Sequence, residues 1–317
     1  MLSPFIFATA VATALSAAPE PVFGAITSSL QSILKNTHAS ADYGYPTDIT
    51  RDLIPLISII GLSKGCTSTE ADVWLYNGTL YVGHDESSLT YERTLENLYI
   101  NPILDVLDRQ NPDSPFLTAP TKNQHDIHLL TRATSGVWDT DTTQTLYFFI
   151  DVKTSGHETF QAVIKALEPL RRKGYLTTLK GGKTVETGPV TIIGTGDTPL
   201  DMVLPVKDRD YFFDAPLASL SEAKYAKVDH TVSPIASTNF VAAVGQVTID
   251  TEPVLRDDQL KALRAQISLA KQRGIGARYW NTPNWPVRQR NLVWRTLLQE
   301  GVGLLNADDL DAVTSFF

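Results

Sequence analysis

The chain has 317 residues, 43% hydrophobic and 20% charged, which is enough to bury the core of one large globular domain. Its formal net charge of −8 and the lack of a long run of Lys and Arg argue against binding to nucleic acid or to an anionic membrane. Cys66 is the only cysteine, which excludes an intrachain disulfide.

The amino terminus has the features of a secretory leader sequence. Residues 4–18 carry no charged side chain, and they are too short and too rich in alanine for a transmembrane helix. Ser16 and Ala18 are small residues that suit a cleavage site. We predict a signal peptide over residues 1–18, a secreted protein, and one domain over residues 30–317. The alternative is an uncleaved leader that serves as a membrane anchor.

Strand-like apolar segments alternate along the chain with amphipathic helical patterns, as in repeated β/α units. The predicted strands cover residues 32–38, 66–75, 146–151, 190–194, 211–214, 232–236, 275–280 and 302–306. The predicted helices cover residues 51–63, 95–109, 158–173, 257–273 and 286–300, and residues 111–144 and 176–189 read as long loops. Eight such strands, without a Gly-x-Gly-x-x-Gly motif, favour an α/β fold of the closed (β/α)8 TIM barrel type over an open sheet.

Two carboxylates, Glu70 and Asp72, stand two residues apart in a predicted strand and should point to the same face. Asn77-Gly78 predicts a two-residue hairpin turn that returns His84 toward them. The combination indicates half of a divalent-metal site, with a solvated strand edge as the alternative. Asn77 also begins the only Asn-x-Ser/Thr sequon, a predicted glycosylation site that agrees with secretion.

Polar side chains at the ends of later strands are further candidates, since barrel chemistry gathers at the carboxyl ends of strands. Asp151 and Lys153 follow five apolar or aromatic residues and share one face. They suit a third metal ligand and a phosphate-binding ammonium, or else an ordinary ion pair. Asp214, at another strand end, either contacts substrate or metal or caps the following turn.

Short motifs that recur in a fixed order carry a resemblance to a known family. They lie at residues 70–75, 80–84, 93–95, 98–100, 150–156, 188–191, 193–196, 211–217, 233–237, 278–280 and 304–306. Together they resemble the altered inheritance of mitochondria protein 6 family. That family belongs to the phospholipase C-like phosphodiesterases, with glycerophosphodiester phosphodiesterases and spider sphingomyelinase D toxins as relatives.

The resemblance implies a TIM barrel that binds one Mg²⁺ or Ca²⁺ through Glu70, Asp72 and Asp151. It also implies that Lys153 and Trp280 line the pocket for the substrate, a small phosphodiester or phospholipid of glycerol or lipid type. A hard cation that prefers oxygen ligands is suited to neutralising the non-bridging oxygens of such a substrate.

In those relatives an internal hydroxyl attacks phosphorus while two histidines act as base and acid, and His84 matches the second of them. The first is missing here. Where the family carries Ser-His-Asn-Asp-Tyr, residues 39–43 read Ala-Ser-Ala-Asp-Tyr, so Ser40 stands in place of the histidine and Ala41 in place of the asparagine. His38 is two positions earlier, about 6.6 Å along a strand, and replaces the base only if residues 44–50 reshape the strand end.

Three functions remain open on the sequence. The first is a metal-dependent phosphodiesterase that uses His84 and His38. The second is a non-catalytic binder of phosphodiesters or lipid headgroups, because general acid–base catalysis is worth about two to four powers of ten in rate and the base is in doubt. The third is a barrel glycoside hydrolase, which needs two carboxylates about 5 to 9.5 Å apart on either side of a sugar.

Overall fold

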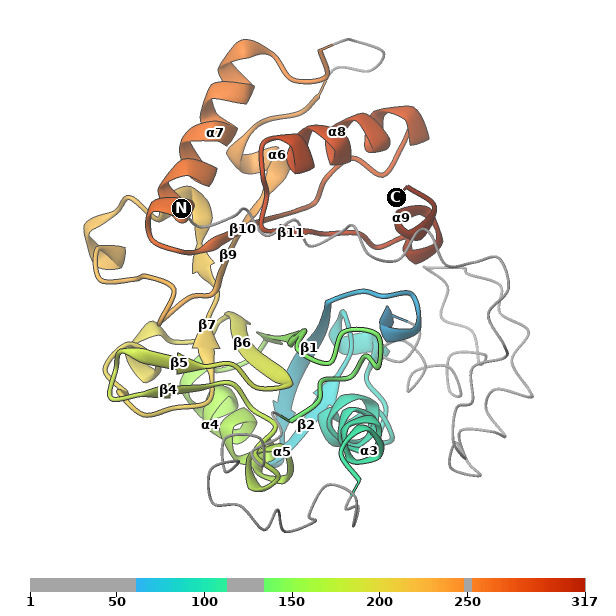
Figure 1. Ribbon diagram of the computed structural model, residues 1–317, viewed down its shortest axis with the longest axis vertical. Helices are drawn as coiled ribbons and strands as arrows, with labels where there is room; N and C mark the ends of the chain where they lie inside the picture. Colours follow the sequence, from blue (N-terminus) through green and yellow to red (C-terminus); the bar gives the residue numbers. More distant parts are fainter. Residues whose placement is uncertain (1–60, 113–133, 248–252, 317) are drawn as a thin grey trace, which may run out of the picture.

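The computed structural model of the protein describes residues 61–112, 134–247 and 253–316. The predicted signal peptide, the predicted strand at residues 32–38, and His38 and Ser40 lie outside the described residues, as does most of the predicted helix at residues 51–63. The described residues form a mixed α/β fold with two mainly parallel sheets (Figure 1).

The first sheet contains five strands in the order β2-β1-β3-β6-β7. Its strands β1, β3, β6 and β7 are parallel, whereas β2 is the antiparallel partner of β1 in a hairpin. The bounds are Ser68–Tyr76 for β1, Thr79–Val82 for β2, Leu146–Val152 for β3, Val190–Gly196 for β6 and Phe212–Phe213 for β7.

The second sheet contains four parallel strands in the order β11-β10-β9-β8. Their bounds are Ala215–Pro216 for β8, Ile235–Asn239 for β9, Gly276–Trp280 for β10 and Leu304–Leu305 for β11. Only Asp214 separates β7 of the first sheet from β8 of the second. The small hairpin of β4 (Thr178–Lys180) and β5 (Thr184–Glu186) forms within the predicted loop at residues 176–189.

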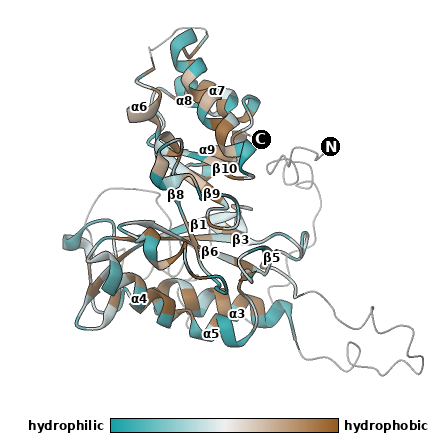
Figure 2. Cartoon of the chain, turned by 90° about the vertical axis from the view of Figure 1, so that its left-hand side faces the viewer, coloured by the Kyte–Doolittle hydropathy of each residue, from teal (hydrophilic) through white to brown (hydrophobic). Residues whose placement is uncertain are grey.

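The helices cover the outer faces of both sheets. In Figures 1 and 2, α3, α4 and α5 lie on one side of the first sheet, and α6, α7 and α8 lie beyond the second sheet. Their bounds are Asn101–Gln110 for α3, Gly156–Ala166 for α4, Glu168–Arg172 for α5, Phe240–Ala243 for α6, Asp257–Gln272 for α7, Val287–Gln299 for α8 and Leu310–Phe316 for α9. None of the helices in the described ranges has the length and apolar character needed to cross a bilayer.

The apolar core divides into two clusters, as alternation along the strands requires. In β3, Phe148 and Ile150 join the large cluster that includes helix residues, whereas Phe149 points to the other face. The smaller cluster brings together side chains from both sheets and the β4–β5 hairpin: Phe149, Leu179, Ile193, Phe212, Ile235 and Leu304. The inner faces of the two sheets therefore pack on one another. A complete (β/α)8 barrel stays a prediction, because the strand expected at residues 32–38 is not described.

Several predicted bounds were wrong for local reasons. The predicted strand at residues 232–236 begins only at Ile235, because Val232 and Ser233 form a turn in which both amides donate to the Asp229 carbonyl. The predicted helix at residues 158–173 is broken into α4 and α5 next to Pro169, which cannot donate a helical hydrogen bond.

Other helix ends agree with the sequence more closely. The helix predicted at residues 95–109 is present, although it opens with a π-helical turn, Glu96–Ile100, ahead of α3. Glycines follow α5, α7 and α8 with positive φ angles of 71°, 72° and 79°, at Gly174, Gly274 and Gly301. A left-handed glycine at these positions ends a helix without the steric penalty that a side chain would bring.

Candidate metal centre

The β1–β2 hairpin positions the first two carboxylates. Tyr76 pairs with Thr79, and the two residues between them, Asn77 and Gly78, have φ angles of 50° and 80°, which confirms the predicted two-residue turn. Along β1 the buried residues Ala71 and Val73 alternate with the partly exposed Glu70 and Asp72. Glu70 and Asp72 therefore share the face that the sequence assigned to them.

The third carboxylate comes from the neighbouring parallel strand. Asp151 of β3 pairs in register with Asp72 of β1, so the two side chains leave the sheet side by side. One oxygen from each of Glu70, Asp72 and Asp151 lies within 4.8 Å of the others. Gly196 at the end of β6 makes room for this, since a Cβ there would stand 2.0 Å from Asp151 Oδ1.

Lys153 supplies a positive charge beside the acidic residues. Its Nζ lies 2.5 Å from Asp151 Oδ2 and 3.6 Å from Asp72 Oδ1. Burial works against the ammonium, but the hydrogen bond and charge of Asp151, together with the charges of Asp72 and Glu70, raise the pKa of Lys153 above its ordinary value. Burial likewise raises the pKa of Asp151, and Lys153 only partly offsets this.

His84 lies on the solvent-exposed side of the acidic cluster. Its Nδ1 is 3.2 Å from Asp72 Oδ2, and 92% of its side chain is exposed. The chain is fixed here by two contacts of Gly83, whose amide donates to the Asp72 carbonyl at 3.1 Å and whose carbonyl accepts from Trp74 Nε1 at 2.8 Å. Asp85 instead caps a short 3₁₀ helix, Glu86–Ser88, by accepting from the Ser88 amide.

The second sheet contributes Arg278, to which the sequence reasoning gave no role. Arg278 Nη2 donates to Glu70 Oε2, and this contact joins β10 of the second sheet to β1 of the first. Its position in the sequence could have indicated a role, because Arg278 stands two residues before Trp280, which was predicted to line the pocket, and residues two apart in a strand share a face. Trp280 itself is 44% exposed at the end of β10.

Asp214 lies between the two sheets and is almost fully buried, with 8% of its surface exposed. Burial raises its pKa to about 7, although the charge of Arg278 acts in the opposite direction. Its Oδ1 is buried and has no hydrogen-bond partner within the described parts of the chain.

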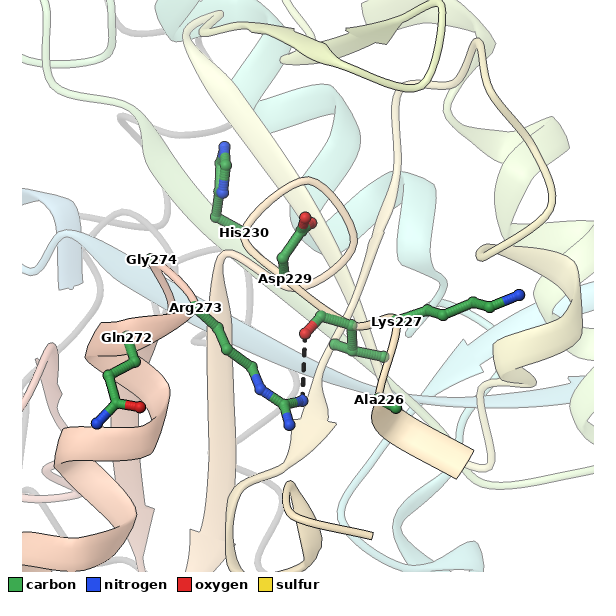
Figure 3. A pocket seen from close by; sticks show the side chains of 8 residues that line it. Ala226, Lys227, Asp229, His230, Gln272, Arg273 and Gly274 are labelled. Carbon is green, nitrogen blue, oxygen red and sulfur yellow. Dashed lines mark hydrogen bonds between the residues drawn. The ribbon is translucent and has the colours of Figure 1, made fainter. Parts of the chain in front are cut away.

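A surface hollow lies near the amino-terminal ends of β9 and β10 (Figure 3). It is lined by residues 226–230, which precede β9, and residues 272–274, which precede β10. Arg273 Nη1 donates to the carbonyls of Tyr225 and Val228 at 2.7 and 3.3 Å and so ties these two segments together. None of the predicted site residues lines this hollow.

The donor set at the acidic cluster suits a hard divalent cation. All three candidate ligands are carboxylate oxygens, the type preferred by Mg²⁺ and Ca²⁺. Oxygens bound to one Ca²⁺ stand about 2.3 to 2.6 Å from it, hence at most about 5.2 Å apart, and the 4.8 Å spread agrees with that limit. The three oxygens are therefore close enough together for one Ca²⁺, whereas Mg²⁺, with ligands about 2.0 to 2.1 Å away, would need them within about 4.2 Å of one another.

Comparisons with known proteins agree on one family. The AIM6-like phosphodiesterase domain matches residues 35–214. Altered inheritance of mitochondria protein 6 homolog from Arthroderma benhamiae is 46% identical over 97% of this chain and 98% of that protein. Altered inheritance of mitochondria protein 6 is 30% identical in Eremothecium gossypii, over 90% of this chain and 70% of that protein. The protein of the same name in Saccharomyces cerevisiae strain S288c is 32% identical over 80% of this chain and 66% of that protein.

No solved structure gives a significant match to the chain. The family match covers more than half of the sequence, and it includes all three carboxylates of the cluster, His84 and Lys153. The chain therefore belongs to the AIM6-like phosphodiesterase domain family.

Proposed function

We propose that this protein is a divalent-metal-dependent phosphodiesterase that cleaves a small phosphodiester or phospholipid of glycerol or lipid type. The observation that carries the proposal is the convergence of Glu70, Asp72 and Asp151, with one oxygen of each within 4.8 Å of the others. Membership of a phosphodiesterase-like family supports the reaction class. A barrel glycoside hydrolase gains no such support from the comparisons.

The three carboxylates would hold Mg²⁺ or Ca²⁺, and a bound ion would neutralise charge on the non-bridging oxygens of the phosphate. Lys153, whose Nζ lies 2.5 Å from Asp151 and 3.6 Å from Asp72, would hold another phosphate oxygen. Trp280 would border the pocket through its exposed side chain. In this assignment Asp214, which is buried between the two sheets, would contact the substrate.

His84 is the proposed acid. To act as the acid, the ring must carry a proton on both nitrogens: Nδ1–H donates to Asp72 and holds the imidazole in place. Nε2–H then passes its proton to the leaving oxygen, which leaves the ring neutral. His38 is the proposed base, as the only histidine close in sequence to Ser40.

Secretion, the signal peptide over residues 1–18 and glycosylation of Asn77 form part of the same proposal. Asn77 occupies an exposed hairpin turn, a position at which a glycan causes no clash with the core.

The test is metal-dependent turnover by the full chain, with Mg²⁺ or Ca²⁺, of 2-hydroxypropyl 4-nitrophenyl phosphate, a chromogenic diester that carries an internal hydroxyl. The wild type should release nitrophenol only with the ion present, and Asp151→Asn should lose about 100-fold or more of that rate, because a ligand carboxylate is gone. Asp201→Asn is the control for loss of a carboxylate elsewhere, since Asp201 pairs with His157 and lies outside the cluster. Equal rates for the wild type and Asp151→Asn would overturn the proposal.

A second candidate function is a non-catalytic phosphodiester binder, and the specific observation that favours it is Ser40 in place of the family histidine. The same assay separates the two candidates when His38→Ala is included. An active wild type that His38→Ala inactivates supports the enzyme with His38 as base. A wild type that binds the diester and the ion without turnover supports the binder.

A further inference from the structure

Arg278 is an unusual charge at the candidate site, because it comes from the second sheet and is buried. Only 7% of its surface is exposed. In β10 it stands in register between Ser237 of β9 and Leu304 of β11, and its side chain reaches Glu70 of β1. A guanidinium in this position must be held by specific partners, since burial of an unpaired charge is costly.

Those partners fix the plane of the guanidinium. Its central carbon lies 4.5 Å from the centroid of the Phe149 ring. Nε and Nη2 both donate to Asn306 Oδ1, at 3.0 and 2.6 Å, and Nη2 also donates to Glu70 Oε2. Nη1 takes part in none of the hydrogen bonds found within the described ranges. Arg278 is therefore preorganised, with donor capacity that the neighbouring side chains do not use.

A count of charges shows what Arg278 contributes. The three carboxylates, offset by Lys153 and Arg278, leave one net negative charge, and one divalent ion would change this to one positive charge. Without Arg278 the loaded site would be neutral, with no net attraction for an anion. Ionisation of Asp214 would lower both totals equally, so the difference of one unit due to Arg278 remains.

We propose that Arg278 is an anion-binding residue of this site and determines its affinity for singly charged phosphodiesters. Its guanidinium donates to a non-bridging oxygen of the diester while Asn306 and Phe149 keep it in place. Arginine suits this role because it stays charged and presents planar donors that match phosphate oxygens. The inference deepens the proposed phosphodiesterase function and rests on it.

The test compares binding of two probes, Mn²⁺ alone and then dimethyl phosphate in the presence of saturating Mn²⁺. Electron paramagnetic resonance measures the ion, and calorimetry measures the diester. Arg278→Gln should bind dimethyl phosphate about 10-fold to 100-fold more weakly than the wild type, which corresponds to loss of a charged hydrogen bond. It should bind Mn²⁺ at least as tightly, because a positive charge near the ion is removed.

Arg290→Gln is the matched control. Arg290 is also buried, with 8% exposed, stacks on Trp294 at 4.7 Å and pairs with Asp309 at 3.1 Å, but it belongs to α8 and makes no contact with the cluster. Its replacement should leave both affinities unchanged. If Arg278→Gln does not fold, Arg278→Lys takes its place; lysine keeps the charge without the planar donors, and the diester should again bind more weakly.

The outcomes separate the inference from the proposed function. A wild type that binds Mn²⁺ and dimethyl phosphate, with unchanged diester affinity in a folded Arg278 variant, overturns the role of Arg278 alone. Parallel loss of Mn²⁺ and diester binding in that variant also overturns it, because this would show a structural role. A wild type that binds neither probe overturns both the inference and the proposed function.

Discussion

The two sheets make opposite contributions to the candidate site. The first sheet supplies the negative charge, with Glu70 and Asp72 on β1 and Asp151 on β3. Lys153, two residues after Asp151, pairs with it and offsets part of this charge. The second sheet supplies Arg278, which reaches across to Glu70. Under the proposed function, the first sheet would hold the metal ion by itself, whereas recognition of an anionic substrate would need side chains from both sheets.

The largest effect is expected at His84, which belongs to the first sheet's half of the site. His84→Ala should lower the metal-dependent phosphodiesterase rate by about two to four powers of ten, the usual value of an acid–base group. Metal affinity should change little, because the imidazole is outside the three-carboxylate set. The rate is measured with 2-hydroxypropyl 4-nitrophenyl phosphate, and the metal affinity is measured by titration with Mn²⁺.

The control for this variant is His157→Ala. His157 also faces an aspartate, with Nε2 3.0 Å from Asp201 Oδ2, and it is likewise well exposed. It therefore reproduces the local pair without the acidic cluster. Equal rates for His84→Ala and His157→Ala would remove His84 from the mechanism.

The next prediction separates the two faces of β3. Phe149→Ala and Phe148→Ala should each destabilise the fold by about 3 to 5 kcal/mol, the usual cost of such a truncation. Only Phe149→Ala should also weaken dimethyl phosphate binding, because Phe149 supports Arg278, whereas Phe148 stacks on Tyr99 at 5.2 Å. Urea unfolding measures stability and calorimetry measures binding. Diester binding weakened equally in both variants would refute the distinction.

The smallest effect concerns Asp214, where the two sheets meet. Burial raises its pKa to about 7, so the folded protein keeps a proton that the unfolded chain releases near pH 4. The stability that this proton contributes is complete below about pH 4 and is lost as the pH rises toward 7. Between pH 5 and 7 the free energy of unfolding of the wild type should therefore fall by about 2 kcal/mol through this group. Asp214→Asn cannot ionise, so it should not show this fall.

Urea unfolding at these two pH values checks the prediction. Parallel pH profiles for the wild type and Asp214→Asn would mean that Asp214 is ionised in the folded state throughout this range. Asp210→Asn is a suitable second comparison, because Asp210 is also buried but is paired with Arg171 at 2.5 Å.

The sequence was informative where the determining interactions are local. Alternation along a strand and the Asn77-Gly78 turn were enough to place Glu70, Asp72 and His84 together, and the structure agrees. Asp151 was predicted from its place at a strand end, and parallel pairing then sets it beside Asp72. Strand and turn rules act over a few residues, so they can be read from the chain.

The remainder depends on packing between distant segments. Arg278 and Glu70 are 208 residues apart. The position of Arg278 two residues before Trp280 could have indicated the face of the strand, but it does not indicate the contact with Glu70. The strand predicted at residues 211–214 is shorter in the structure, where β7 covers only Phe212–Phe213. This also has a tertiary cause, since the chain passes from one sheet to the other at Asp214. Residues 32–38, which would complete the barrel and bear on His38, remain a prediction.

The most direct test of the account is the location of a bound ion. Crystals of the protein soaked in Mn²⁺ should show one strong anomalous peak within about 2.6 Å of carboxylate oxygens from Glu70, Asp72 and Asp151. The peak should vanish in Asp151→Asn. No peak at this position in the wild type, or a peak that Asp151→Asn leaves unchanged, would contradict the claim that these three side chains form a metal centre.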